Sequence, residues 1–158
     1  MGQSNEGIQL ITNGLAAMRA TGTTLNTPGI LTRLADAYRL AGQPDTALTN
    51  VAEAAHFAET TRTQWGHAET LRLRGDLLIL TGDHPAAEVS YRDAITLARR
   101  QGAKLLELRA STSLARLWRD QDKAREAYAL LAPIYGWFTE GFDTADLQDA
   151  AKLLAELA

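Results

Sequence analysis

The sequence contains no cysteine among its 158 residues, which excludes disulfides, cysteine-ligated metals and thiol nucleophiles. It also lacks a long apolar run, since no segment approaches the roughly 18 consecutive apolar residues of a transmembrane helix. Its first residues, MGQSNEGIQL, have neither the basic nor the apolar region of a secretory signal peptide. We therefore expect a cytoplasmic chain with no membrane partner.

A large excess of either charge is also missing, because the net charge is −3 and only 22% of the residues are charged. Nucleic acid is therefore not expected as a partner. The P-loop, dinucleotide-binding, zinc-protease and nucleophile-elbow motifs are absent as well. The three histidines, His56, His67 and His84, fall in different parts of the predicted repeat and are not expected to converge on a metal. We expect no cofactor, no metal site and no enzymatic activity from this chain alone.

Three aspartates near the C-terminus, Asp143, Asp146 and Asp149, are the remaining candidate cation ligands. A calcium loop of the EF-hand type needs oxygen ligands at alternate positions and a glycine at the sixth, and that spacing is not found here. Carboxylates three residues apart at the start of a helix are instead stabilised by the helix dipole. We interpret these aspartates as residues of a helix N-terminus.

The positive signal is an internal repeat with a period of 40 residues. Several columns share this register, namely Ala35, Gly75 and Ala115; Gly42, Gly82 and Asp122; and Ala47, Ala87 and Ala127. Two antiparallel helices joined by a short turn approach closely only where a small side chain lies at their crossing point. The first and third columns therefore predict the crossing points of helical hairpins, and the second column predicts their turns.

Each period is expected to form a first helix, a turn and a second helix. In the first period, Thr27 is the expected N-cap with Pro28 at the first helical position, Gly42 ends the helix, and Pro44 begins the second helix. The expected organisation is one domain, with a lone second helix over 1–22, repeats over 27–62, 63–102 and 103–139, and a capping helix over 143–158. The predicted fold class is therefore all-α, a right-handed superhelix of antiparallel helix pairs.

The residues Ala35, Tyr38, Ala47, Val51 and Ala54 resemble the tetratricopeptide (TPR) pattern of small and large apolar positions, and the second period repeats it. The period of 40 exceeds the usual 34, which implies helices longer by about one turn. This resemblance implies a superhelix that binds a protein or peptide on its concave face.

The stretches 110–121 and 131–147 show a second, closer resemblance. They are similar to the C-terminal end of bacterial multidomain proteins that carry an N-terminal class III adenylate or guanylate cyclase or a DNA-binding domain, a central AAA-type ATPase and a TPR tail. The resemblance implies that this chain is such a tail, acting as a regulatory module that docks on the parent's own ATPase or cyclase domains or recruits a partner. It brings no cyclase or ATPase residues with it.

The TPR register assigns the concave face to four positions of each first helix. The candidate partner-binding residues are Thr32, Asp36, Arg39, Glu69, Arg72, Asp76, Arg109, Thr112, Arg116 and Arg119. Because the last period contributes three arginines, we expect that part of the face to bind an acidic segment of a partner or of the parent protein. A plain solvated helix face remains the alternative for these residues. Small-ligand sensing, or a contribution to cyclase activity in the parent, remains the alternative function.

The first predicted helix has an apolar stripe formed by Ile8, Ile11, Leu15 and Met18. As a lone second helix without its hairpin partner, it would leave Leu10 uncovered on its other side. Uncovered apolar surface at the end of a repeat array tends to associate. We therefore expect a weak homodimer through this N-terminal helix.

Overall fold

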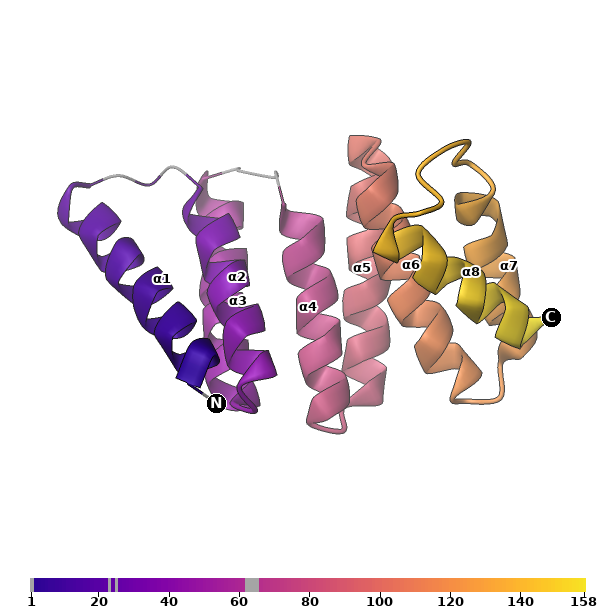
Figure 1. Cartoon of the computed structure of the whole chain (residues 1–158), viewed down its shortest axis with the longest axis horizontal. Coiled ribbons are helices and arrows are strands. Elements are labelled where there is room, and N and C mark those ends of the chain that lie inside the picture. Colours follow the sequence, from indigo (N-terminus) through magenta and orange to yellow (C-terminus); the bar gives the residue numbers. More distant parts are fainter. Residues whose placement is uncertain (1, 23, 25, 62–65) are drawn as a thin grey trace.

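The computed structural model describes residues 2–22, 24, 26–61 and 66–158, with side chains from residue 6 onward (Figure 1). Every regular element in these ranges is a helix, which confirms the all-α prediction. The helices are α1 (Gly2–Ala20), α2 (Thr27–Leu40), α3 (Pro44–Thr61), α4 (His67–Leu80), α5 (His84–Gln101), α6 (Lys104–Arg119), α7 (Ala124–Tyr135) and α8 (Ala145–Leu157).

Consecutive helices pair into hairpins, α2 with α3, α4 with α5, and α6 with α7 (Figure 1). Helices α2, α4 and α6 also contact one another in turn, so the first helices of the hairpins share one side of the molecule. At the ends, α1 packs on α2, and α8 packs on both α6 and α7. The side formed by α2, α4 and α6 is therefore closed at its C-terminal end by α8.

The three hairpin turns have the same backbone geometry. Gly42, Gly82 and Asp122 have left-handed φ values of 74°, 84° and 61°. The residue that follows each of them donates its backbone N–H, at 2.9 Å, to the carbonyl oxygen five residues earlier. Left-handed residues end helices in this way, and aspartate is one of the few non-glycine residues that tolerate the conformation. The start of α2 differs from our expectation, because its N-cap is Asn26 in a left-handed conformation and Thr27 is already helical.

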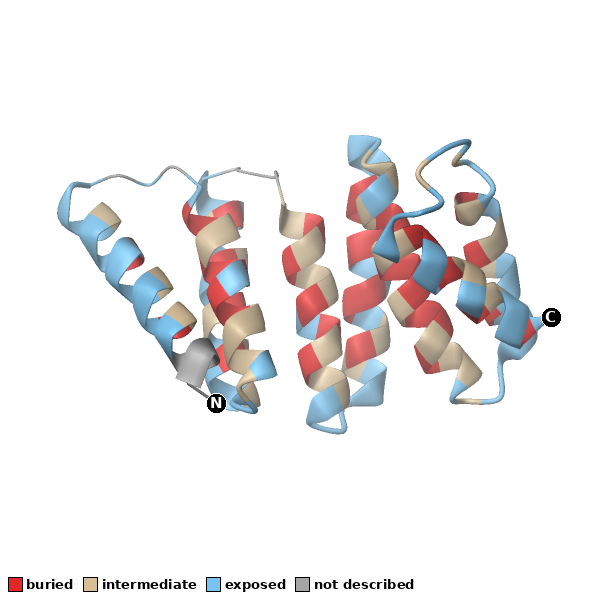
Figure 2. Cartoon of the chain, in the orientation of Figure 1, coloured by how far each residue is buried: buried red, intermediate tan, exposed pale blue. Residues whose placement is uncertain are grey.

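The small residues at the hairpin crossings are fully buried. Ala35, Ala47, Ala115 and Ala127 have no exposed surface, as Figure 2 illustrates for the core of the hairpins. Helices α4 and α5 approach closely at Gly75, where an added Cβ would be only 2.3 Å from Cε1 of Tyr91 on α5. Because Tyr91 is itself only 3% exposed, its ring cannot move away cheaply.

A buried charge joins α5 to α6. Glu107 is 4% exposed and accepts hydrogen bonds from Arg99 Nε at 2.7 Å and from Lys104 Nζ at 2.8 Å. Burial alone would raise the pKa of Glu107, but the hydrogen bonds from Lys104 and Arg99 outweigh it and lower that pKa. This carboxylate is therefore a structural contact between two hairpins, on the side of α6 that faces α5.

Helix α1 has one covered and one uncovered side. Ile8 and Leu15 are buried against α2, whereas the Leu10 side chain is 75% exposed. Among the described residues, and apart from the neighbouring backbone of α1 itself, nothing lies within 4 Å of a Cβ added at Gly7 or Gly14. Among the described residues, no helix is long and apolar enough to cross a membrane.

Candidate binding groove

The inner sides of α2, α4 and α6 line an open groove of about 960 Å³. It continues along the same helices into two smaller hollows of about 310 and 380 Å³, which reach α8 and the C-terminal ends of α4 and α6. The apolar residues of the main groove are Ala37, Leu40, Leu73, Ala103 and Leu106, and its charged residues are Arg33, Asp36, Glu69, Arg72 and Arg109. The groove therefore offers both apolar surface and charge to a ligand.

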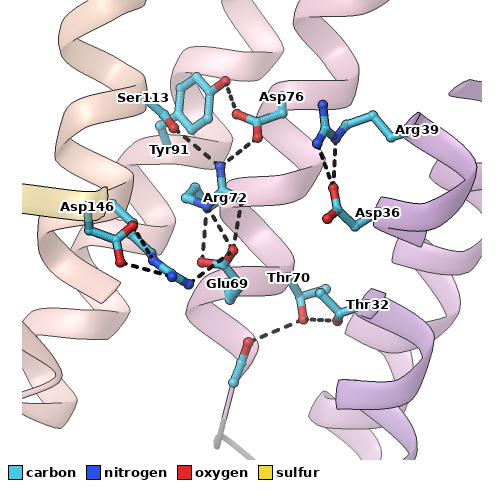
Figure 3. Close-up of polar contacts among 12 residues, drawn as sticks. Thr32, Asp36, Arg39, Glu69, Thr70, Arg72, Asp76, Tyr91, Ser113 and Asp146 are labelled. Atoms are coloured by element: carbon cyan, nitrogen blue, oxygen red, sulfur yellow. Dashed lines mark hydrogen bonds and ion pairs between the residues drawn. The ribbon is translucent and has the colours of Figure 1, made fainter. Parts of the chain in front are cut away.

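Arg72 lies at the centre of the charged surface, between two carboxylates of its own helix (Figure 3). Its Nη2 is 2.8 Å from Glu69 Oε1, and its Nη1 is 2.6 Å from Asp76 Oδ2. The spacings of three and four residues place all three side chains on one face of α4. Burial disfavours the Arg72 charge, but the hydrogen bonds and charges of Glu69 and Asp76 outweigh it and raise the Arg72 pKa. Arg72 thus stays charged and is neutralised within the helix.

Asp76 also connects α4 to α5. The Tyr91 hydroxyl donates a hydrogen bond of 2.8 Å to Asp76 Oδ1 (Figure 3). Burial and the neighbouring Asp76 charge raise the Tyr91 pKa, so the phenol remains a donor at all physiological pH values. Both oxygens of Asp76 are therefore occupied by internal donors, and this carboxylate is a structural element of the groove wall.

The three arginines of α6 are paired with acidic residues of α8. Arg109 binds Asp146 through Nε at 2.9 Å and Nη2 at 3.0 Å, and Arg119 Nη1 is 2.6 Å from Glu156 Oε2. Between them, Arg116 forms an ion pair with Asp149. In this structure the acidic segment that these arginines bind is the chain's own capping helix. Their contact with an acidic segment of a partner or a parent protein stays a prediction.

The sequence contains a signal for this pairing that the repeat register alone does not capture. Arg109, Arg116 and Arg119 recur at helical spacing on one face of α6, and Asp146, Asp149 and Glu156 do so on one face of α8. Two helix faces of opposite charge and comparable length are complementary. Asp146 does lie in the first turn of α8, as expected, and in addition it contacts the neighbouring helix α6.

Two predicted surface residues are buried instead. Thr32 is 9% exposed, and its hydroxyl contacts the Pro28 carbonyl and the Thr70 hydroxyl, each at 2.8 Å. Thr112 is 4% exposed and donates to the Leu108 carbonyl at 2.9 Å. A threonine hydroxyl can bond back to the preceding turn, which allows it to face a helix interface. Thr32 nevertheless lines the main groove and Thr112 the adjoining hollow, although their hydroxyls bond within the protein, so contact of these two residues with a partner stays a prediction.

Asp36 and Arg39 remain at the groove edge, where they pair with each other at 2.8 Å (Figure 3). The repeat also places exposed leucines there: Leu40 is 69% exposed beside the main groove and Leu80 is 59% exposed beside a smaller hollow. These two leucines are 40 residues apart, so the period would have revealed them. Arg33, on the α2 wall, was not predicted because it lies outside the four register positions.

Cation binding has little support in the rest of the molecule. Within the part of the chain that the structure describes, no three histidine, aspartate or glutamate side chains form a group that could hold a metal ion. His67 lies at the start of α4, and burial lowers its pKa, so it is neutral at physiological pH. The groove is therefore the candidate site.

No protein-family model matches the sequence, and no curated protein matches it. Solved structures, in contrast, match almost the whole chain. The crystal structure of the TPR-like repeats of a putative kinesin light chain from Podosopora anserina has a TM-score of 0.73 and 17% identity, covering 99% of this chain and 78% of that chain. A variant of that protein gives a TM-score of 0.74 at 17% identity, covering 99% and 77%. The similarity confirms that this chain has a TPR-like repeat fold.

Proposed function

We propose that this chain is a protein-interaction module that binds a peptide segment of a partner protein in the groove between α2, α4 and α6. The observation that carries the proposal is the groove itself, with about 960 Å³ of open space on the inner side of three successive hairpins. Stacked helical repeats generally use such concave surfaces to bind other proteins.

The composition of the groove supports a peptide ligand. Exposed apolar side chains such as Leu40 offer area to bury, and burial of apolar surface is the main favourable contribution to association. Charged side chains such as Arg72 are held in place by their own ion pairs, so they lose little conformational freedom when a ligand binds. A pre-organised wall of this kind suits recognition of an extended or helical segment.

We further propose a larger setting, in which the chain acts as the C-terminal regulatory tail of a cytoplasmic bacterial signalling protein with an ATPase domain and a cyclase or DNA-binding domain. Its support is the resemblance of the stretches 110–121 and 131–147 to such tails. The groove would then bind a segment of the parent's own domains or of a recruited protein. In this role the tail contributes no chemistry, so ATP turnover or cyclic-nucleotide production by the chain alone would contradict it.

Selection from a displayed library of random peptides tests the binding function. The full chain is the bait, and selected peptides are titrated against wild type, Leu40→Lys and Val89→Lys by fluorescence anisotropy. Leu40 lines the groove, whereas Val89 is a 58% exposed apolar residue of α5 outside it and serves as the matched control.

We expect selected peptides to bind wild type and Val89→Lys equally and Leu40→Lys about tenfold more weakly, since a buried charge would replace an apolar contact. Failure to select any peptide, or equal binding to both variants, would contradict the proposal.

A further inference from the structure

The charges of the groove differ in whether they already have a partner. Arg72 is neutralised by Glu69 and Asp76, and Arg109 binds Asp146. These pairs lie within one helix or between neighbouring helices, so a ligand that used either arginine would have to displace a formed contact. Neither arginine therefore offers a free positive charge to a ligand.

Arg33 is the exception. It is exposed on α2, and within the described ranges no hydrogen bond, ion pair or aromatic contact involves its side chain, although it lines the groove. It lies one helical turn from Gly29 and from Ala37, both of which line the groove, so it is in the middle of the α2 wall. The acid nearest to it along the helix, Asp36, is bound by Arg39 at 2.8 Å.

The groove that Arg33 lines also carries apolar side chains. Leu40 lies seven residues further along α2, and Leu106 lines the groove from α6, together with charged residues such as Glu69. An arginine beside apolar surface is desolvated when a ligand covers it, which strengthens its contact with a carboxylate and penalises a cation or an unpaired charge.

We infer that the groove recognises a peptide segment that combines apolar side chains with a carboxylate, and that Arg33 binds this carboxylate. The inference rests on the proposed function and specifies its ligand. The chain supplies an internal precedent, because the acidic and apolar helix α8 places Asp146 against Arg109 while its leucines join the core. The main groove, at the other end of the same concave side, also combines an arginine, Arg33, with apolar side chains, and no helix of the described chain covers it.

The peptides selected on the full chain are the probes for this inference. Each is titrated against wild type, Arg33→Glu, Asp36→Asn and Arg125→Glu, at low and at high salt. Arg125 is an exposed arginine of α7 that does not line the groove, so its reversal controls for the change in overall charge. A second set of peptides carries each acidic residue as its amide.

We expect the selected peptides to share an acidic residue and to bind Arg33→Glu about tenfold more weakly than wild type, with no change for Arg125→Glu. Asp36→Asn removes a negative charge that would repel the ligand carboxylate, and it releases Arg39 from its ion pair, so we expect this variant to bind the acidic peptides more tightly. The amide peptides and high salt should weaken binding to wild type but strengthen binding to Arg33→Glu, because the introduced glutamate repels the ligand carboxylate and both changes reduce that repulsion.

Two outcomes would overturn the inference. Peptides that depend on Leu40 but lack an acidic residue, or that bind Arg33→Glu as wild type, would leave the groove as a binding site and remove Arg33 as its anion contact. The absence of any selected peptide would instead remove the proposed function and the inference with it.

Discussion

Arg109 of α6 and Asp146 of α8 form a bidentate ion pair, with Nε 2.9 Å from Oδ1 and Nη2 3.0 Å from Oδ2. The pair joins residues 37 positions apart and fixes the capping helix across the last hairpin. Two parallel hydrogen bonds between an arginine and a carboxylate fix their relative orientation as well as contributing to stability. The pair therefore sets the orientation of α8 on α6. The cap therefore covers apolar surface and balances the charge of α6 at once.

This pair should show a measurable coupling in a double-mutant cycle. The two side chains are 39% and 28% exposed, so we expect Arg109→Ala and Asp146→Ala to be coupled by only about 0.5–1 kcal/mol in the free energy of unfolding. Urea unfolding of the wild type, both single variants and the double variant measures the coupling, and added salt should reduce it. Additive effects would mean that apolar contacts alone position α8.

Gly75→Ala should destabilise the protein, although alanine is the better helix former. The new Cβ would be 2.3 Å from the Tyr91 ring, and overpacking of this kind costs about 1–3 kcal/mol. Gly14→Ala in α1 is the matched control, because no other described part of the chain lies within 4 Å of the added Cβ, and we expect it to stabilise the protein by up to about 1 kcal/mol. Thermal unfolding measures the stability of both variants relative to wild type. A Gly75→Ala variant more stable than wild type would contradict the close approach of α4 and α5.

The hairpin architecture could be predicted because its determinants are local. Gly42, Gly82 and Asp122 end their helices within a few residues, and small residues at the crossings recur in the same register. The start of α2 was harder to predict because it has no such local signal. Sequence preference favoured Thr27 as the N-cap, but in the structure the N-cap is Asn26, in a left-handed conformation.

The groove could be predicted only in part. Periodicity placed Asp36, Glu69 and Arg72 on its walls. It could not show that Thr32 and Thr112 turn inward, because a threonine that bonds to its own helix is compatible with either side. The pairs of Arg72 and Arg39 within their own helices follow from local spacing. The pairs between α6 and α8 depend on which helix covers the arginines, which the repeat register does not specify.

Glu107→Gln should remove part of the protein's sensitivity to acid. The folded-state pKa of Glu107 lies below its ordinary value of 4.5, so the carboxylate stabilises the fold above that pH and this contribution is lost as the pH falls through the folded-state pKa. We expect the variant to be about 1–2 kcal/mol less stable near neutral pH and the difference to shrink below about pH 4.5. Urea unfolding across this range measures it, and a constant difference at every pH would contradict the assignment.

The expected homodimer through α1 remains a prediction. Leu10, 75% exposed on the uncovered side of this helix, would lie at the centre of the contact. Sedimentation equilibrium should show weak, concentration-dependent association of the wild type that Leu10→Glu abolishes, because the contact would bury a charge. A wild type that stays monomeric at high concentration would rule the dimer out.

Mapping of a selected peptide by NMR tests the proposed groove most directly, because it locates the ligand without assuming which residue binds it. We predict amide shift changes in the inner walls of α2, α4 and α6, at residues such as Gly29, Ala37 and Glu69, and none at Thr49 or Val89 on the outer sides of α3 and α5. Shift changes centred on α3 or α5, with the groove walls unaffected, would contradict peptide binding in the groove.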